Sequence, residues 1–121
     1  MSPLTVAQFF KGRPESRRLF TALRQQAETL GAVGVKVSRS QVALVRGKKT
    51  FARVWLPRQY LGRGAPLVLT LGFRQRDPSP RWKEVTEAAP GRFTHHLEIQ
   101  AVEDIDAQVL AWLRQARDER P

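Results

Sequence analysis

The two histidines of the chain stand next to each other in the segment RFTHHLEIQ, residues 92–100. Imidazole side chains bind metals and transfer protons near neutral pH, so this segment is the first that could carry chemistry. The alternation of apolar and polar residues around the pair is typical of a β-strand, in which neighbouring side chains point to opposite faces. We expect His95 on the apolar face of that strand and His96 on the opposite face with Thr94 and Glu98. The pair therefore cannot clamp one metal ion.

Neither histidine has the partners that a metal site or a catalytic site requires. His96 and Glu98 offer two metal ligands, but the sequence shows no third or fourth ligand to complete a site. For His95, the apolar face favours a buried histidine held by a hydrogen bond over a catalytic base. The chain also has no nucleophile elbow, Walker-type loop, dinucleotide fingerprint or metalloprotease motif. We predict no catalytic residue, no metal and no cofactor, and a non-enzymatic protein is favoured over an enzyme.

The segment SPRWKEV, residues 79–85, precedes the histidine pair and holds a Trp between two cations. If it forms a strand beside the histidines, Arg81 and Lys83 join His96 in a small polar site suited to an anion. One hypothesis is therefore a pocket for a small anionic metabolite, with enzymatic chemistry at the histidine pair as its extension. The candidate residues of this pocket are Trp82, Lys83, Glu84, His95 and His96.

Charge is the most informative property of the composition. The chain has 121 residues, with 21 Lys and Arg against 11 Asp and Glu, and a formal net charge of +10. Residues 1–83 hold 17 of the cations and 3 of the acids, and Asp77 is the single acid among 12 cations in residues 36–83. Such a field attracts polyanions, and nucleic acid is the commonest of them. Arg-rich usage also follows from a GC-rich genome, so charge alone leaves a neutral explanation open.

The second hypothesis, which we favour, is a surface that binds DNA or RNA with little sequence specificity. In KTFARVWL, residues 49–56, alternation puts Phe51, Arg53 and Trp55 on one face, where rings can stack on bases and cations neutralise phosphates. Packing inside the protein is the competing explanation for Trp55. The candidate nucleic-acid-binding residues are Lys36, Arg39, Arg46, Lys48, Lys49, Phe51, Arg53, Trp55, Arg58, Arg63, Arg74 and Arg81.

Two helices are predicted at the N-terminal end of the chain. Thr5 and Gln8 have the spacing of a capping box at the start of the first helix, and Gly12 ends it. Pro14 suits the first turn of the second helix, and Gly31 is its stop signal.

The rest of the chain is predicted to complete a single α+β domain over residues 1–121. Alternating apolar residues predict an antiparallel sheet over about residues 33–100, because the connections are too short for parallel crossovers. An apolar stripe that includes Trp112 and Leu113 predicts an amphipathic C-terminal helix over about residues 104–117. We expect the helices to pack on one face of the sheet.

The composition gives no sign of a secreted or membrane protein. No stretch approaches the ~20 apolar residues of a membrane span, and the first residues do not follow the pattern of a signal peptide. The absence of cysteine excludes disulfides and zinc–thiolate sites. We expect a cytoplasmic protein without a membrane partner.

Three motifs taken together resemble a bacterial family of domains of unknown function, DUF5655. They are SRSQVAL, FARVWLPRQYLG and SPRWKEVTEAAPGRFTHHLEI, and the likeness spans nearly the whole chain. The resemblance implies a one-domain bacterial protein and brings no catalytic residues with it. More weakly, the order of helices and sheet resembles small YdhG-type α+β domains, one of which is a frataxin-like iron chaperone. That likeness implies acidic iron-binding surfaces, from which this basic chain departs.

Overall fold

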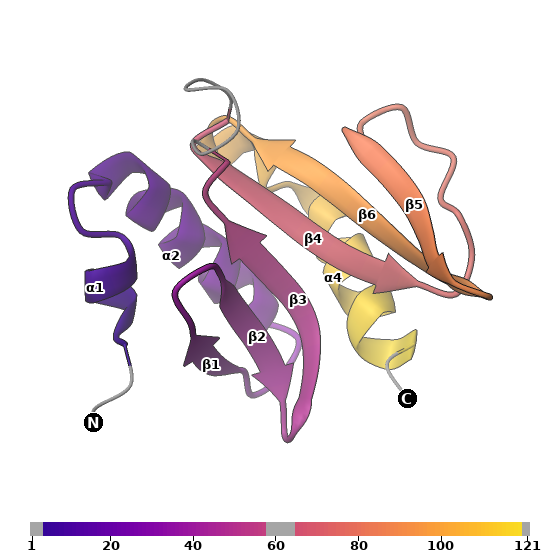
Figure 1. The fold of residues 1–121 in the computed structure, drawn as a ribbon, viewed down its shortest axis with the longest axis horizontal. Helices are drawn as coiled ribbons and strands as arrows, with labels where there is room; N and C mark the ends of the chain where they lie inside the picture. Colours follow the sequence, from indigo (N-terminus) through magenta and orange to yellow (C-terminus); the bar gives the residue numbers. More distant parts are fainter. Residues whose placement is uncertain (1–3, 58–64, 120–121) are drawn as a thin grey trace.

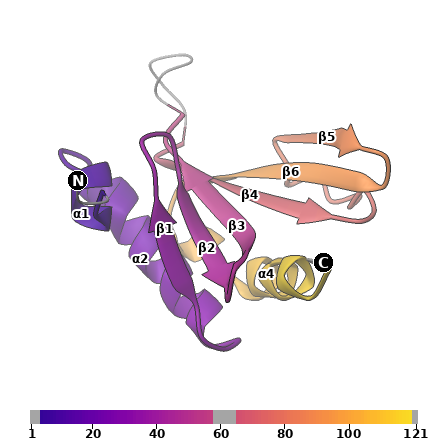
Figure 2. The same cartoon turned by 60° about the horizontal axis from the view of Figure 1, so that its bottom comes forward.

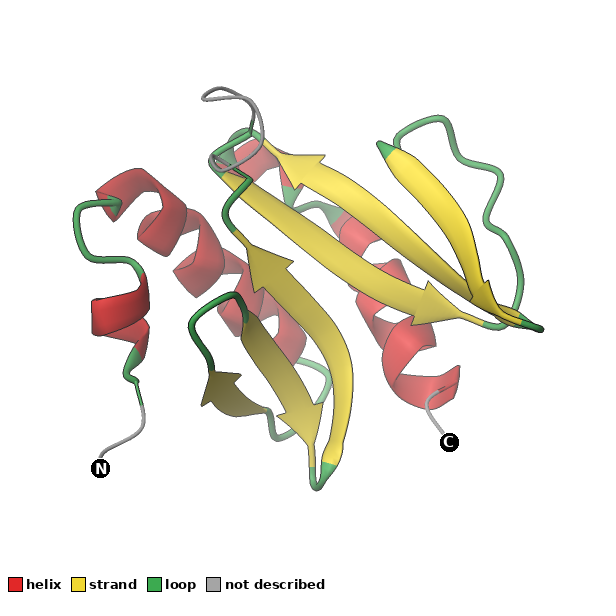
Figure 3. Cartoon of the chain, viewed as in Figure 1, coloured by secondary structure: helices red, strands yellow, loops and turns green. Residues whose placement is uncertain are grey.

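The computed structural model describes residues 4–57 and 65–119 (Figure 1). Within these residues the helices and strands follow the α+β order that the sequence predicts (Figure 3). In chain order they are α1 (Val6–Phe9), α2 (Pro14–Glu28), β1 (Gly34–Val37), β2 (Val42–Arg46), β3 (Lys49–Trp55), β4 (Leu67–Phe73), β5 (Glu84–Ala89), β6 (Arg92–Ile99), the 3-10 helix η1 (Val102–Asp104) and α4 (Ala107–Glu119). The candidate residues Arg58 and Arg63 lie outside the described residues.

Local sequence signals set the two N-terminal helices. The hydroxyl oxygen of Thr5 accepts the backbone N–H of Gln8 at 3.1 Å, and Gln8 Oε1 accepts the N–H of Thr5 at 2.8 Å, which completes the capping box. Gly12 separates α1 from α2 with a φ of +75°, a conformation that other residues rarely adopt. Pro14 is the first residue of α2, where its missing N–H and fixed φ are tolerated.

The strands form one antiparallel sheet in the order β1-β2-β3-β4-β6-β5. The β2–β3 and β5–β6 connections are tight turns in which Gly47 and Gly91 have φ values of +62° and +72°. Because β4 pairs with β6, β5 lies at one edge of the sheet and β1 lies at the other. The antiparallel sheet predicted from the short connections is confirmed.

Both long helices cover the same face of the sheet (Figures 1 and 2). α4 packs on β3 and β4, and α2 packs on β4 and against α4. The core lies between these helices and the sheet, and its fully buried side chains include Phe20, Leu69 and Leu113. The opposite face carries no helix within the described ranges, and we call it the open face.

The final helix begins a few residues later than the sequence predicts, at Ala107. Asp106 Oδ1 accepts the N–H of Val109 at 3.1 Å, which is the geometry of an N-cap. Asp104 instead closes the preceding turn, where its Oδ2 accepts the N–H of Gln100 at 2.8 Å. Of the acids that crowd this region, Asp106 is therefore the one that fixes the start of the helix.

Trp112 should contribute strongly to stability. It is 5% exposed, and its ring packs against that of Trp82 with centroids 4.1 Å apart. We expect Trp112→Ala to lower the free energy of unfolding by about 3–5 kcal/mol, because the change removes a buried indole and leaves a cavity. Urea denaturation measures the loss, with Ala111→Ser at the exposed neighbouring position as the control. A loss below about 1 kcal/mol for Trp112→Ala would contradict the burial of this ring.

Candidate functional site

One row of side chains crosses the whole sheet on the open face, because the strand register places one residue of each strand opposite the next. From β1 to β5 the row consists of Lys36, Ala43, Arg53, Thr70, His96 and Glu84. Sequence neighbours of the row, such as Val54 and Leu69, are buried beneath the helices, which assigns the row to the opposite face. This open-face row is cationic toward the β1 edge and ends in a carboxylate at the β5 edge.

The first three strands and their turns carry positive charge without compensation. Residues 34–55 contain six cations and no acid. The six are Lys36, Arg39, Arg46, Lys48, Lys49 and Arg53, and all are exposed. The ion pairs found among the described residues join other cations to their acids. The carboxylates nearest to this region in the sheet lie on β5 and β6, so charge changes sign across the open face.

A chain of hydrogen bonds links three side chains on the open face. Trp55 Nε1 donates to the hydroxyl oxygen of Thr70 at 2.9 Å, and that oxygen lies 2.8 Å from His96 Nδ1. An indole N–H can only donate, so the Thr70 hydroxyl accepts from Trp55. Among the described residues His96 Nδ1 is the one other partner of this hydroxyl, so we assign the hydroxyl proton to the bond with His96. His96 is then neutral, with an unprotonated Nδ1 and its proton on Nε2.

The surroundings of His96 favour this neutral form. Burial of the imidazole lowers the pKa of His96, and the charge of Glu84 on the neighbouring strand opposes that shift without cancelling it. Protonation would place a second proton on Nδ1, and the Thr70 hydroxyl would have to turn away from it. His96 therefore presents a neutral N–H donor at neutral pH.

A second polar cluster lies on the helix side of the sheet, around the carboxylate of Asp77. Asp77 Oδ1 accepts the Nε1–H of Trp82 at 3.0 Å and the backbone N–H of Ser79 at 2.9 Å. Its Oδ2 accepts the Nε1–H of Trp112 at 3.2 Å. Burial alone would raise the pKa of Asp77, but these hydrogen bonds outweigh it and lower the pKa. The ionised carboxylate thus joins the β4–β5 connection to α4.

His95 belongs to this second cluster. Its ring is 0% exposed, and Nε2 accepts the backbone N–H of Asp77 at 3.0 Å. Nδ1 lies 3.1 Å from the carbonyl oxygen of Phe93 and must therefore carry the proton that it donates there. Burial lowers the pKa of His95 and keeps the ring neutral. His95 is the buried, hydrogen-bonded histidine that the apolar face of the strand predicts.

Arg81 does not join Lys83 and His96 in one polar site. Its guanidinium donates to Asp106 at 3.1 Å, to Gln108 Oε1 at 2.7 Å and to the carbonyl oxygen of Asp104 at 3.0 Å. It also lies over the ring of Trp112, 5.5 Å from the ring centroid. The start of α4 thus holds Arg81 on the helix side, whereas His96 faces the open side.

The candidate pocket residues are divided between the two faces of the sheet. Trp82 and His95 are buried in aromatic contact, with ring centroids 4.8 Å apart. Lys83 and Glu84 are exposed, and Glu84 pairs in register with His96 on the open face. The five residues therefore do not line one cavity.

The nucleic-acid candidates are more nearly together, with three exceptions among the described residues. Phe51 is 4% exposed and belongs to the hydrophobic core, at the register shift between β2 and β3, so its ring is not displayed for stacking. Arg74 follows β4, where its backbone N–H donates to Glu119 Oε1 at the end of α4 at 2.8 Å. Arg81, the third exception, is held at the start of α4. Trp55 is not an exception, because it lies half-buried on the open face.

Two residues of these clusters, Thr70 and Asp77, were not predicted as site residues. Thr70 is the one hydrogen-bonding side chain in the apolar strand LVLTLGF of β4, and its alternation places it on the open face. Asp77 is the single acid among the cations of residues 36–83. An isolated polar residue in an apolar strand and an isolated acid in a basic segment are the signals that point to them.

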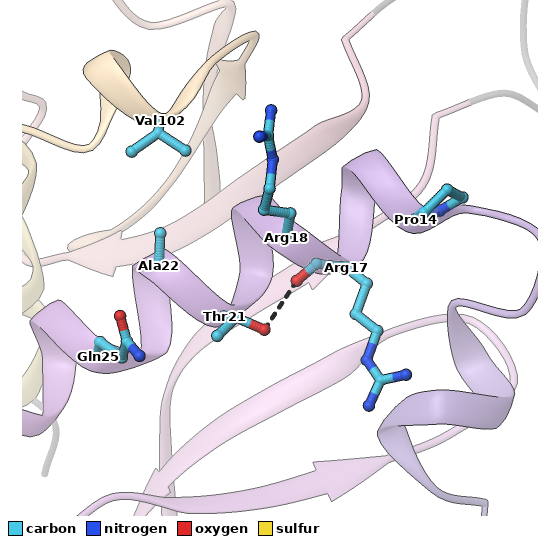
Figure 4. A pocket seen from close by; sticks show the side chains of 7 residues that line it. All are labelled: Pro14, Arg17, Arg18, Thr21, Ala22, Gln25 and Val102. Carbon is cyan, nitrogen blue, oxygen red and sulfur yellow. Dashed lines mark hydrogen bonds between the residues drawn. The ribbon is translucent and has the colours of Figure 1, made fainter.

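A shallow groove of about 430 Å³ runs along α2 beside η1 (Figure 4). The groove is lined by Pro14, Arg17, Arg18, Thr21, Ala22, Gln25 and Val102. Arg18 is paired with Glu15 at 2.9 Å, and the hydroxyl of Thr21 donates to the carbonyl oxygen of Arg17 at 3.0 Å. The groove contains neither histidine and no residue of the open-face row.

Among known protein families, one matches nearly the whole chain. The family described as "Domain of unknown function (DUF5655)" matches residues 6–118. The chain belongs to this family. No curated protein and no solved structure matches the chain. The weaker likeness to frataxin-like domains finds no support, and the described residues hold no group of three or more His, Cys, Asp or Glu that could bind a metal ion.

Among the described residues, no helix has both the length and the apolar character needed to cross a membrane.

The Asp77 cluster predicts the effect of replacing its charge. We expect Asp77→Asn to lower the free energy of unfolding by about 1–3 kcal/mol, because an amide NH2 would face an indole N–H and leave a buried donor unpaired. Asp118→Asn is the control, since Asp118 is exposed in its pair with Arg117 and should change stability little. Urea denaturation followed by Trp fluorescence compares the two variants. Equal stabilities would show that Asp77 does not hold the two indoles.

The two histidines predict how stability depends on pH. In the folded protein both pKa values lie below the ordinary value of 6.5, so below about that pH the unfolded chain binds protons that the folded chain does not. We expect the free energy of unfolding to fall between about pH 7.5 and pH 5.5, and His96→Asn to remove part of this fall. Urea denaturation at both pH values measures it. Stability that rises on acidification would contradict the neutral state of both rings.

Proposed function

We propose that the protein binds DNA or RNA, without catalysis, through the exposed cations of β1, β2, β3 and their turns, of which Lys36 and Arg53 stand in the open-face row. The observation that carries the proposal is the uncompensated charge of residues 34–55, where six exposed cations stand without an acid. Lys and Arg that neutralise phosphates release condensed counterions, and this gain needs no particular base sequence. The expected binding is therefore strongly salt-dependent and of little sequence specificity.

The spread of these cations suits a polymer better than a small ion. Lys36 and Arg53 stand in one row, separated by two strand spacings, or about 10 Å. Arg39 lies at the β1–β2 turn, and Lys48 lies at the β2–β3 turn. A small anion needs donors that converge on one point, whereas a phosphate backbone presents charges at intervals along its length. The proposal also places the protein in the cytoplasm of a bacterium, where such a ligand is available.

The alternative ligand is a small anionic metabolite bound near the histidine pair. It has less support, because Trp82 and His95 face the helices whereas Glu84 and His96 face the open side. Enzymatic chemistry at His95 has less support still, since both of its ring nitrogens are engaged and the ring is 0% exposed. Salt separates the two proposals, because affinity for one small ligand changes little with salt and affinity for a polyanion changes steeply.

Fluorescence anisotropy with labelled single-stranded and duplex oligonucleotides over a salt series tests the proposal. The test variant is Lys36→Gln/Arg53→Gln, and the control is Arg92→Gln/Arg114→Gln, which removes the same charge from the start of β6 and from α4. If both test cations contact phosphates, the log–log salt slope should become shallower by about 1.4 for single strands and about 1.8 for duplex. The control should keep the slope of the unmodified protein.

Two results would count against the proposal. Absence of binding to either oligonucleotide at low salt, where electrostatic attraction is strongest, would sink it. Equal losses of affinity in the test variant and in the control would show that net charge alone, and not the position of Lys36 and Arg53, attracts the ligand.

A further inference from the structure

The side chains of the open-face row are of different kinds on the two sides of Thr70. On the β3 side stands Arg53, and on the β6 side stand His96 and then Glu84. A phosphate backbone is attracted by Arg53 and repelled by the carboxylate of Glu84. A ligand that covers the whole row must therefore present phosphate at one end and another chemistry at the other.

The two groups beyond Thr70 form a neighbouring donor and acceptor. Glu84 stands directly opposite His96 in the register of β5 and β6, and Glu84 is exposed. Carboxylate oxygens only accept hydrogen bonds, and the bond of His96 with Thr70 leaves its Nε2–H as a donor that has no hydrogen-bond partner among the described residues. Glu84 makes no ion pair within the described ranges. The edges of unpaired nucleobases carry donors and acceptors side by side and match such a pair.

We infer that His96 and Glu84 contact the base edges of a single strand whose phosphates lie over Lys36 and Arg53. The inference rests on the proposed function and names its substrate class as single-stranded nucleic acid. In a duplex the Watson–Crick edges are already paired, so they are not offered to these side chains. Arg53 and His96 are two strand spacings apart, about 10 Å, which separates the phosphate side of the site from the base side.

Thr70 is the positioning residue of this site. Its hydroxyl is held by Trp55 and in turn fixes which nitrogen of His96 carries the proton. Thr70 is 7% exposed, so a ligand reaches it through His96 and not directly. The methyl group of Val in place of the hydroxyl would keep the shape of the residue and release the imidazole to either tautomer.

The experiment compares base preference with salt slope. Anisotropy is measured with single strands of dA, dC, dG and dT for the unmodified protein and for Glu84→Gln. The control Glu103→Gln removes the same charge from η1 on the helix side. We expect Glu84→Gln to change the relative affinities for the four strands by about two- to tenfold, the range for one hydrogen bond, and to leave the salt slope unchanged. The control should change neither quantity.

A second experiment tests the positioning role of Thr70 by two readouts, the tautomer of His96 in the free protein and the affinity for single strands. Nitrogen NMR should find His96 protonated on Nε2 in the unmodified protein and in Thr70→Ser. In Thr70→Val we expect a mixture of tautomers, together with a two- to tenfold weaker affinity for single strands at an unchanged salt slope. Thr70→Ser, which keeps the hydroxyl, should restore both properties.

The outcomes separate this inference from the function on which it rests. If the protein binds with a steep salt slope but Glu84→Gln raises affinity equally for all four strands, Glu84 only repels phosphate and the inference is overturned. His96 protonated on Nδ1 would overturn it as well. If no oligonucleotide binds at low salt, the proposed function fails and the inference fails with it.

Discussion

The alternation of side chains along β6 places two neighbouring residues in different environments, one in the buried core and one on the open face. The helices cover only one face of the sheet, so His95 is sealed among aromatic rings whereas His96, its neighbour, faces the open side. A one-residue slip in the pairing of β4 and β6 would exchange the two and place Glu98 in the core. Burying that carboxylate without a partner is costly, and this cost opposes the slipped register and protects the contacts of both histidines.

On the covered side, the ionised carboxylate of Asp77 provides hydrogen-bond acceptors inside the core. Two indoles, those of Trp82 and Trp112, are buried in it, and each brings an N–H that must find an acceptor. Asp77 accepts from both Trp82 and Trp112, and its own backbone N–H is taken by His95. One residue of the β4–β5 connection thereby links that connection, β6 and α4. Arg81 adds a second link to α4 through Asp106.

On the open side, the polar groups face outward and charge changes sign across the strands. The hydrogen-bonded chain from Trp55 through Thr70 to His96 stands where the basic strands meet the acidic edge. The proposed interface uses this change from basic to acidic side chains. Phosphates only accept hydrogen bonds, whereas the edges of bases both donate and accept them. On the helix side, by contrast, Arg81 and Arg117 donate to partners within the protein.

The sequence by itself determined the elements and their order, because caps, glycine turns and hydrophobic periods act within a few residues. It also separated His95 from His96, since alternation along a strand is local. Only the tertiary structure decided which distant side chains meet: Asp77 with Trp112, 35 residues apart, Thr70 with His96, 26 apart, and Arg81 with Asp106, 25 apart. These contacts depend on strand order and on how α4 crosses the sheet, and no local pattern carries that information. For the same reason a bulge could turn Phe51 into the core although simple alternation placed it on the open face.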